Sequence, residues 1–196
     1  LVREIADRGH EVASRGYYHR GLRNLSIEEF RADLARTGRA IENATGQKVR
    51  GYRAAEKLNY TRDSWVLDSL SEEGFAYDAS FLPTRKDSEA RRIAGAVETE
   101  SGTIWEFPYS TLNLFAGLAP ISGGNYLRQF PYSITKHAIA RWDKSAKGPF
   151  MFYFHVWEMD PEQPRISAAN LRTRLRHYRK LDKMDWVVRD LLGRYD

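Results

Sequence analysis

The sequence contains no cysteine, which excludes disulfide bonds and thiolate metal sites and leaves the redox compartment open. No apolar run approaches the roughly 20 residues that a membrane-spanning helix needs, and no signal peptide is visible. The first residue is Leu1 rather than methionine, so a segment upstream of it stays possible.

The composition supports a single folded domain over residues 1–196, since 42% of the residues are hydrophobic and 29% are charged. The net charge is +5, and the basic residues gather near the C-terminus. Nucleic-acid binding is one interpretation, but acidic residues are interspersed along the chain and no binding motif accompanies the basic ones. We favour a solvated helix face and leave attraction to an anionic polymer or membrane surface open.

Helix signals recur along the chain. Residues 1–8 resemble the last turns of a helix that Gly9 stops. Ser26 and Glu29 form a capping box for a helix that ends at Gly46. Further helices are predicted from Thr61 to Gly74 and from Ser133 onward, the latter with Ile134, Ala138, Ile139 and Trp142 facing inward. A last helical region over about residues 170–192 carries Leu171, Leu175, Leu181, Val188 and Leu191.

Strands are predicted between these helices, at residues 11–13, within 48–56, 74–83 and 103–112, and at 150–154. Residues 84–103 are predicted to be a loop or a weak hairpin, and residues 117–131 a loop rich in glycine and proline. The alternation of strand and helix favours a parallel α/β sheet or barrel, in which chemistry collects at the carboxyl ends of the strands. Those ends carry Arg15, His19, Arg53, Glu56, Asp78, His155, Glu158 and Asp160.

Six motifs occur in an order that resembles the NodB-type polysaccharide deacetylases, carbohydrate esterase family four. They read "GHEVASRGYYHR", "TGQKVRGYRAAE", "GFAYDASFLP", "EFPYSTL", "SGGNYLRQFP" and "FYFHVWEMDPEQPR". The arginine-rich "LRTRLRHYRKL" resembles the C-terminal extension, here residues 157–196, of a bacterial subgroup associated with exopolysaccharide clusters. The resemblance implies an irregular, incomplete (β/α) barrel whose first strand or strands are missing from this sequence.

The same resemblance implies metal-assisted removal of acetyl groups from N-acetylated sugars, with a divalent ion, most often zinc, as cofactor. His155 matches the general acid that protonates the leaving amine, Arg53 matches the residue that orients a catalytic aspartate, and Asp78 falls loosely near the support of the late histidine. His19 matches the second histidine of a His-x-x-x-His metal pair, but Arg15 stands at the first position.

Sugar contacts are expected from Tyr17, Tyr18, Tyr126 and Trp157, with Glu158 beside them, although packing at the barrel mouth competes as an explanation for the aromatic residues. Without the resemblance, His19 would read as a polar turn residue and Arg53 as a surface charge. Arg53 at an interior site would need a carboxylate partner, for which Glu56 is a candidate.

Arg15 weakens the expected metal site, because a guanidinium is always protonated and never coordinates a metal. One histidine does not hold zinc tightly, and the two aspartates of the family's first strand do not occur in this sequence. Two hypotheses therefore stay open: a metal-dependent amide hydrolase acting on N-acetylated poly- or oligosaccharide, and a catalytically impaired relative that binds glycan. Nucleic-acid binding ranks far behind. The sequence leaves the oligomeric state open, as well as the choice between bacterial cytoplasm and cell envelope.

Overall fold

The computed structural model describes residues 1–114 and 117–195. The chain divides into two compact units, Leu1–Tyr109 and Ser110–Asp196, which are described separately below. The prediction of a single domain over residues 1–196 stays a prediction. Among the described residues, no helix is long and apolar enough to cross a membrane.

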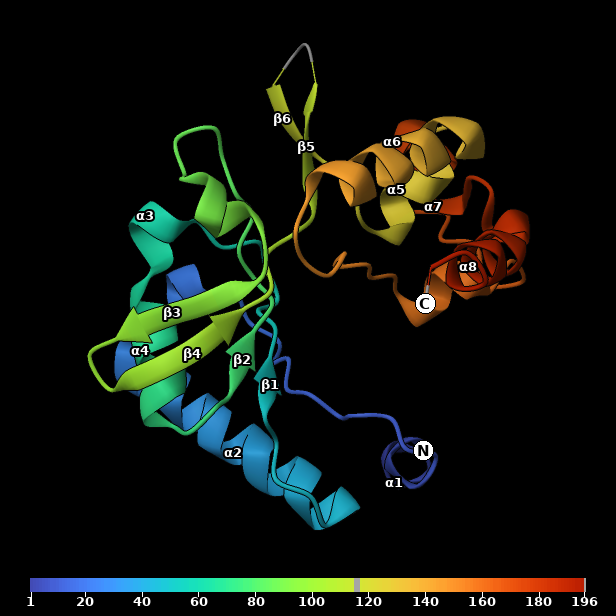
Figure 1. Ribbon diagram of the computed structural model, residues 1–196. Coiled ribbons are helices and arrows are strands. Elements are labelled where there is room, and N and C mark those ends of the chain that lie inside the picture. Colours follow the sequence, from blue (N-terminus) through green and yellow to red (C-terminus); the bar gives the residue numbers. More distant parts are fainter. Residues whose placement is uncertain (115–116, 196) are drawn as a thin grey trace. The chain divides into compact units, whose positions relative to one another are not determined.

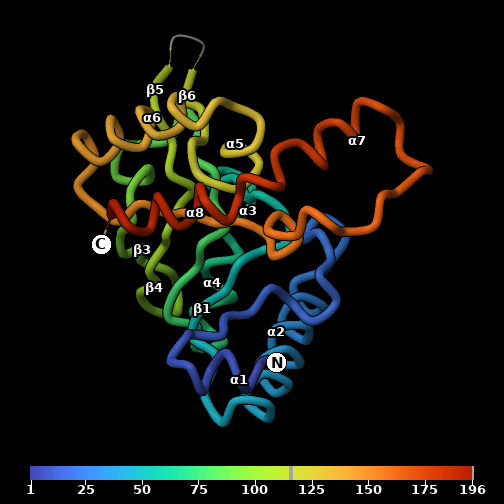
Figure 2. Tube along the Cα trace, turned by 90° about the vertical axis from the view of Figure 1, so that its right-hand side faces the viewer, coloured from blue at the N-terminus to red at the C-terminus, as the bar shows by residue number. Residues whose placement is uncertain are grey.

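Unit 1 is built around a four-stranded sheet in the order β1-β2-β4-β3 (Figure 1). The strands β1, β2 and β4 are parallel, while β3 returns antiparallel to β4. Helix α4 packs against β4. Helix α1 packs against α2, and these two helices lie side by side in Figure 2. The elements are α1 (Val2–Asp7), α2 (Ile27–Thr45), β1 (Gly51–Tyr52), α3 (Tyr60–Asp63), α4 (Trp65–Glu72), β2 (Tyr77–Asp78), β3 (Gly95–Thr99) and β4 (Gly102–Glu106), with short 3-10 turns at Leu22–Asn24 and Glu89–Arg92.

Helix α2 has the limits that its local sequence predicts. The Ser26 hydroxyl accepts from the Glu29 N–H at 3.2 Å, and the Glu29 carboxylate accepts from the Ser26 N–H at 2.8 Å, so the predicted capping box is confirmed. Gly46 ends the helix at φ +74°, a left-handed conformation that glycine adopts without steric cost. The buried face of α2 presents Phe30 and Leu34 to the core of unit 1.

Two local predictions in unit 1 were wrong. Residues 11–13 form no strand, and pairing is limited to an isolated parallel bridge between Ser14 and Tyr52. The chain turns away at once, because Gly16 and His19 both have positive φ, +78° and +52°. Thr61 is not a helix cap, since Asn59 accepts from the Thr61 N–H at 2.9 Å and α3 is already in progress there. Of the two alternatives for residues 84–103, the hairpin is confirmed by β3 and its pairing with β4.

Unit 2 consists of a small hairpin followed by helices. The elements are β5 (Thr111–Leu114), β6 (Gly117–Pro120), α5 (Gly124–Gln129), α6 (Tyr132–Ser145), a 3-10 turn at Val156–Met159, α7 (Leu171–Tyr178), a 3-10 turn at Leu181–Lys183, and α8 (Met184–Leu192). Its largest core cluster joins Leu127 of α5 and Ile139 of α6 to Met184, Val188 and Leu191. A long connection leads out to α7, which then leads back toward α8 (Figure 2).

Several predictions for this unit were wrong. Residues 117–131 are not a loop, since they contain β6 and α5. Residues 150–154 form no strand, because their backbone pairs elsewhere: the Met151 N–H donates to the Ser110 hydroxyl at 2.8 Å, and the Tyr153 carbonyl accepts from the Gly124 N–H at 2.9 Å.

The helices of unit 2 also depart from prediction. Helix α6 begins at Tyr132 after Pro131, so Ser133 is no cap, and Ile134 faces outward. The predicted helix over residues 170–192 is broken where Lys180 takes a positive φ of +53°. Leu181, Val188 and Leu191 are buried. Leu171 and Leu175 are 70% and 65% exposed. They lie in α7, which contributes no residue to the apolar core around α8.

Candidate functional site

The segment from Ser14 to Arg20 carries the candidate metal residues in unit 1. His19 is exposed, whereas Arg15 is half-buried and donates from Nη2 to the Ala54 carbonyl at 3.2 Å. Asp33 of α2 holds the turn, since its carboxylate accepts from the backbone N–H of Tyr17 at 2.7 Å and of Tyr18 at 3.1 Å. A Cβ at Gly16 would lie 2.8 Å from Asp33 Oδ2, so this turn requires glycine.

Tyr17 and Tyr18 form an exposed aromatic pair on this turn. Their rings meet edge to face with centroids 5.0 Å apart. The Arg36 guanidinium of α2 lies over the Tyr17 ring at 4.2 Å and donates to the Tyr18 hydroxyl at 2.5 Å. Arg20 lies over the other tyrosine, Tyr18, at 4.7 Å. The predicted sugar-stacking residue Tyr17 is therefore both accessible and held in place.

Two buried carboxyl groups lie side by side at the carboxyl ends of β2 and β4. Asp78 and Glu106 are register partners in the parallel sheet, and both are almost fully buried. Burial raises the pKa of both groups, and the neighbouring Asp78 charge raises the pKa of Glu106 further. A hydrogen bond between the two carboxyl groups lowers the pKa of Asp78 and raises that of Glu106, which favours placing a shared proton on Glu106.

A hydrogen-bonded path connects this pair to the Arg15 segment. The Ser80 hydroxyl donates to Asp78 Oδ1 at 2.5 Å and accepts from the Ala54 N–H at 2.7 Å. The carbonyl of Ala54 is the acceptor for Arg15. Arg53, the neighbour of Ala54, is half-buried, and its guanidinium lies over the Tyr109 ring at 4.6 Å. The structure thus brings Arg15, Arg53 and Asp78 to one edge of the sheet.

The predicted partner of Arg53, Glu56, lies next to a different cation. Glu56 Oε2 is 3.8 Å from Arg23 Nε. The charge of Arg53 instead acts to lower the pKa of Glu106, against the larger effects of burial and of Asp78. Sequence reasoning missed Glu106, and its position at the head of the "EFPYSTL" motif, where a strand ends, was the available signal.

Unit 2 contains the candidate acid, His155, on an exposed stretch before the 3-10 turn Val156–Met159. Glu158 holds this stretch, since its Oε2 accepts from the His155 N–H at 2.9 Å. Arg128 of α5 donates from Nε to Glu158 Oε1 at 2.8 Å, and the two side chains are 3% and 2% exposed. The backbone that carries His155 is therefore anchored to a buried ion pair.

An aromatic stack extends from His155. Its ring is nearly parallel to that of Trp157 with centroids 5.8 Å apart, and Trp157 stacks on His177 of α7 at 4.3 Å. The Arg128 guanidinium lies over the same indole at 4.9 Å. His177 in turn donates from Nε2 to the Gln163 side-chain oxygen at 3.0 Å, which assigns the tautomer that carries its proton on Nε2. The structure thus brings His155, Trp157 and Glu158 together.

Arg128 and Gly124 are the residues that sequence reasoning missed in this unit. Arg128 Nη1 donates to the carbonyls of Arg176 and His177 at 3.2 and 2.6 Å, which satisfies the C-terminal end of α7. A Cβ at Gly124 would lie 2.2 Å from Glu158 Oε2, so glycine is needed for the close approach of α5. Both lie in the "SGGNYLRQFP" motif, where the paired glycines were the signal. Tyr126, a predicted sugar contact, is half-buried in the same helix.

The residues described do not fit a divalent metal. Across residues 1–114 and 117–195, no group of three or more histidine, aspartate or glutamate side chains is placed to hold an ion. His19 is exposed, and Arg15 contributes a fixed positive charge on the same turn. Metal ligation by His19 therefore stays a prediction.

Two family models match the chain. One, described as a domain of unknown function (DUF3473), matches residues 79–196, and the other, described as polysaccharide deacetylase, matches residues 1–74. The chain therefore belongs to the DUF3473 family, whose model covers more than half of it, and its first 74 residues are similar to the polysaccharide deacetylases. No curated protein matches it.

Solved structures with a similar fold include two proteins described as polysaccharide deacetylases. The one from Mycobacterium smegmatis is 21% identical with a TM-score of 0.58, and the match covers 90% of this chain and 58% of that one. The one from Pseudomonas aeruginosa PAO1 is 19% identical with a TM-score of 0.51, and the match covers 78% of this chain and 49% of that one. A third solved structure, the PuuE allantoinase, is 16% identical with a TM-score of 0.52, and the match covers 90% of this chain and 61% of that one. The chain thus spans roughly half to three fifths of their lengths. Together with the parallel sheet, these likenesses confirm the predicted irregular, incomplete (β/α) barrel class.

Proposed function

We propose that this protein removes acetyl groups from N-acetylated sugars of a bacterial exopolysaccharide. The match of residues 1–74 to the polysaccharide deacetylase model supports the reaction class. The observation that carries the proposal is the support of His155: its backbone is bound by Glu158, and Glu158 is bound by buried Arg128. An exposed imidazole on a rigid backbone is suited to act as a general acid.

His155 acts at the step in which the acetamide C–N bond breaks. Water has by then added to the acetyl carbonyl carbon, and the nitrogen must leave as an amine. The protonated imidazole donates its proton to that nitrogen, so acetate and a free amino sugar are released. Because Glu158 is almost fully buried, its proposed role is to position His155, while Trp157 offers a stacking surface beside the imidazole.

Residues of unit 1 have supporting roles in this proposal. Asp78 is fully buried, so it acts as a positioning residue that holds Ala54, and through it the Arg53 backbone, by way of Ser80. Tyr17 is exposed and can stack on the apolar face of a sugar ring. In unit 2, the half-buried Tyr126 is a second candidate for such a contact. His19 is the remaining candidate metal ligand, but no step is assigned to a metal.

Glycan binding without turnover is the second candidate function. Arg15 favours it, because its guanidinium is half-buried and, by the resemblance, stands where the family has its first metal histidine. A guanidinium forms paired hydrogen bonds with carboxylates, so in this case the cation would hold an acidic group of the glycan.

Acetate release from chitin oligosaccharides, measured with and without added Zn²⁺, tests the first candidate. We expect release that His155→Ala abolishes and that His137→Ala, an exposed histidine of α6, leaves unchanged. Saturable oligosaccharide binding without acetate release, under both metal conditions, would favour the second candidate. The absence of both binding and acetate release would contradict both candidates.

A further inference from the structure

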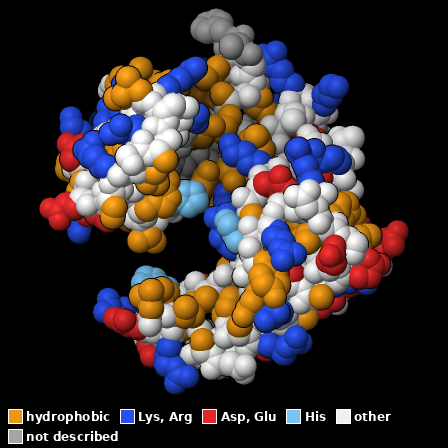
Figure 3. All heavy atoms as spheres, turned by 180° about the vertical axis from the view of Figure 1, so that it is seen from behind, with side chains coloured by type: hydrophobic (Ala, Val, Ile, Leu, Met, Phe, Trp, Pro, Cys, Tyr) orange, Lys and Arg blue, Asp and Glu red, His pale blue; other side chains and the backbone are white. Residues whose placement is uncertain are grey.

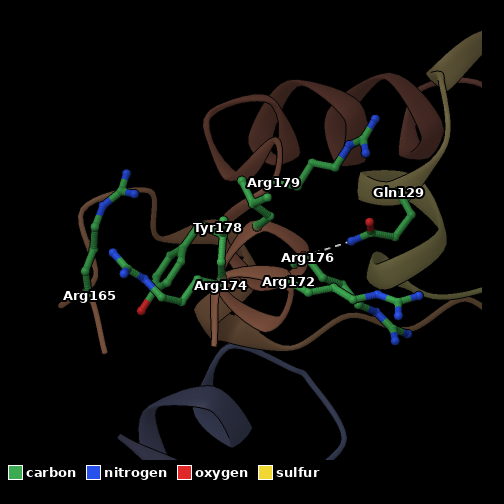
Figure 4. A pocket seen from close by; sticks show the side chains of 9 residues that line it. Gln129, Arg165, Arg172, Arg174, Arg176, Tyr178 and Arg179 are labelled. Atoms are coloured by element: carbon green, nitrogen blue, oxygen red, sulfur yellow. Dashed lines mark hydrogen bonds between the residues drawn. The ribbon is translucent and has the colours of Figure 1, made fainter. Parts of the chain in front are cut away.

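Helix α7 borders a groove of about 790 Å³ whose lining is basic and apolar. Leu171, Leu175 and Tyr178 of α7 supply apolar surface, and Arg172, Arg174 and Arg176 supply guanidinium groups. Figure 4 shows Arg174 and Tyr178 extending to the side of Arg165, while Arg172 and Arg176 extend to the side of Gln129 in α5. The groove therefore has cations on two sides of α7 and apolar side chains in its lining.

The charge of this part of the chain is one-sided. Residues 163–181 contain five arginines and one lysine and no aspartate or glutamate. Since the whole chain has 31 basic and 26 acidic residues, everything outside this segment carries 25 basic and 26 acidic ones. The net positive charge of the protein is thus concentrated beside α7. Burial, followed by the charges of Arg179 and Lys183, lowers the pKa of Lys180, as expected in a positive local field.

The arginines that line the groove have no carboxylate partner among the described residues. Among residues 1–114 and 117–195, the ion pairs do not include Arg165, Arg172, Arg174, Arg176 or Arg179. The helix itself is well anchored, because Arg128 binds its last carbonyls and the Gln129 amide donates to the Arg176 carbonyl at 2.8 Å (Figure 4). At the other wall, the Tyr178 hydroxyl donates to the Pro164 carbonyl at 3.0 Å and accepts from the Ile166 N–H at 2.8 Å.

We propose that this groove binds a strand of acidic polysaccharide, so that the protein acts on a glycan carrying carboxylates as well as acetamido groups. The guanidinium groups pair with the carboxylates, and the exposed side chains of Leu171 and Leu175 receive the apolar faces of the sugar rings. The concave shape favours a chain-like ligand over a flat membrane surface. This inference deepens the proposed function and rests on it for the acetamido part of the ligand.

The test compares hyaluronan oligosaccharides with chitin oligosaccharides of matched length on the whole chain, by calorimetry at low salt. Both probes carry N-acetylglucosamine, and hyaluronan adds carboxylates. We expect tighter binding of hyaluronan, and a loss of about tenfold or more in its affinity for Arg172→Gln/Arg176→Gln. Affinity for the chitin probe stays unchanged. The two side chains are exposed and α5 binds only the Arg176 backbone, so the variant keeps its fold.

Two further variants separate the groove from bulk electrostatics. Arg141→Gln/Lys144→Gln removes two exposed cations from α6 and should leave hyaluronan affinity within about twofold of the parent. Leu175→Ser changes no charge and should weaken hyaluronan binding severalfold. Equal losses in the α6 control and the α7 variant would overturn the proposal. So would an unchanged affinity in Leu175→Ser, or a preference for phosphatidylglycerol vesicles over hyaluronan.

Acetate release distinguishes failure of this inference from failure of the proposed function. If chitin oligosaccharides lose acetate but hyaluronan shows no preference, the groove assignment fails and the reaction stands. If hyaluronan binds at the groove and no acetate is released from either probe, the reaction fails and the binding site stands.

Discussion

Arg128 and Glu158 form a buried ion pair in which Arg128 Nε lies 2.8 Å from Glu158 Oε1. The pair joins α5, the stretch that carries His155, and the C-terminal end of α7. Hydrogen bonds to backbone atoms satisfy further atoms of both side chains, which is the condition under which a buried ion pair is tolerated. Unit 2 therefore has a polar centre in addition to its apolar clusters.

Removing one partner of this pair should be strongly destabilising. Arg128→Met leaves the Glu158 carboxylate buried without its cation and is expected to lower the free energy of unfolding by about 3–5 kcal/mol. Urea denaturation measures the loss. Arg189→Met, which breaks the exposed pair with Asp185, should leave the free energy of unfolding nearly unchanged, because water screens the attraction. Equal costs for the two variants would show that burial of the Arg128–Glu158 pair contributes nothing.

Adding a side chain at Gly124 should disturb the same centre. Gly124→Ala places a Cβ 2.2 Å from Glu158 Oε2, so either α5 or the carboxylate must shift. We expect a lower melting temperature and weaker proton donation by His155, seen as reduced acetate release. Gly38→Ala is the matched control, because nothing lies within 4 Å of its Cβ and alanine in the interior of α2 should stabilise by up to about 1 kcal/mol. An unchanged melting temperature in Gly124→Ala would contradict the close approach of Gly124 to Glu158.

The shared proton of Asp78 and Glu106 predicts a pH dependence of stability. Glu106 has a folded-state pKa well above its ordinary value of 4.5, so the fold binds a proton that the unfolded chain releases. Its contribution to stability is complete below about pH 4.5 and is lost as the pH rises through the folded-state pKa.

Glu106→Gln tests this linkage, since glutamine still donates to Asp78 but does not titrate. Urea denaturation across pH should show a flatter profile for this variant and a relative gain in stability at high pH. Glu98→Gln removes an exposed carboxylate from the same hairpin and should leave the profile unchanged. The shared proton is refuted if Glu106→Gln and the parent lose stability in parallel.

Arg15→His should restore part of a metal site. The change replaces a permanent cation with an imidazole on the same turn as His19, so affinity for Zn²⁺ should rise. Equilibrium dialysis measures it. Arg20→His adds a histidine directly beside His19 and serves as the control, because it lacks the His-x-x-x-His spacing. A gain that is no larger for Arg15→His than for Arg20→His would contradict an ancestral metal pair.

Predictions succeeded where the signal was local. The limits of α2 follow from Ser26, Glu29 and Gly46, which act on backbone groups within one turn of themselves. Predictions failed where distant partners compete for the backbone. The apolar run at residues 150–154 has the composition of a strand, but its polar backbone groups pair with the Ser110 hydroxyl and the Gly124 N–H. Composition does not reveal such partners.

By itself the sequence determined the order of motifs that resembles the polysaccharide deacetylases, and from that resemblance comes the prediction that Arg15 stands where the family has a metal histidine. It also determined the acid-free run of arginines around α7, since charge content is a property of the chain. The tertiary structure alone decided that Asp78 meets Glu106, that Arg128 meets Glu158, and that Leu171 and Leu175 face outward. These relationships join residues brought near by folding, and their energies depend on burial, which no stretch of sequence specifies alone.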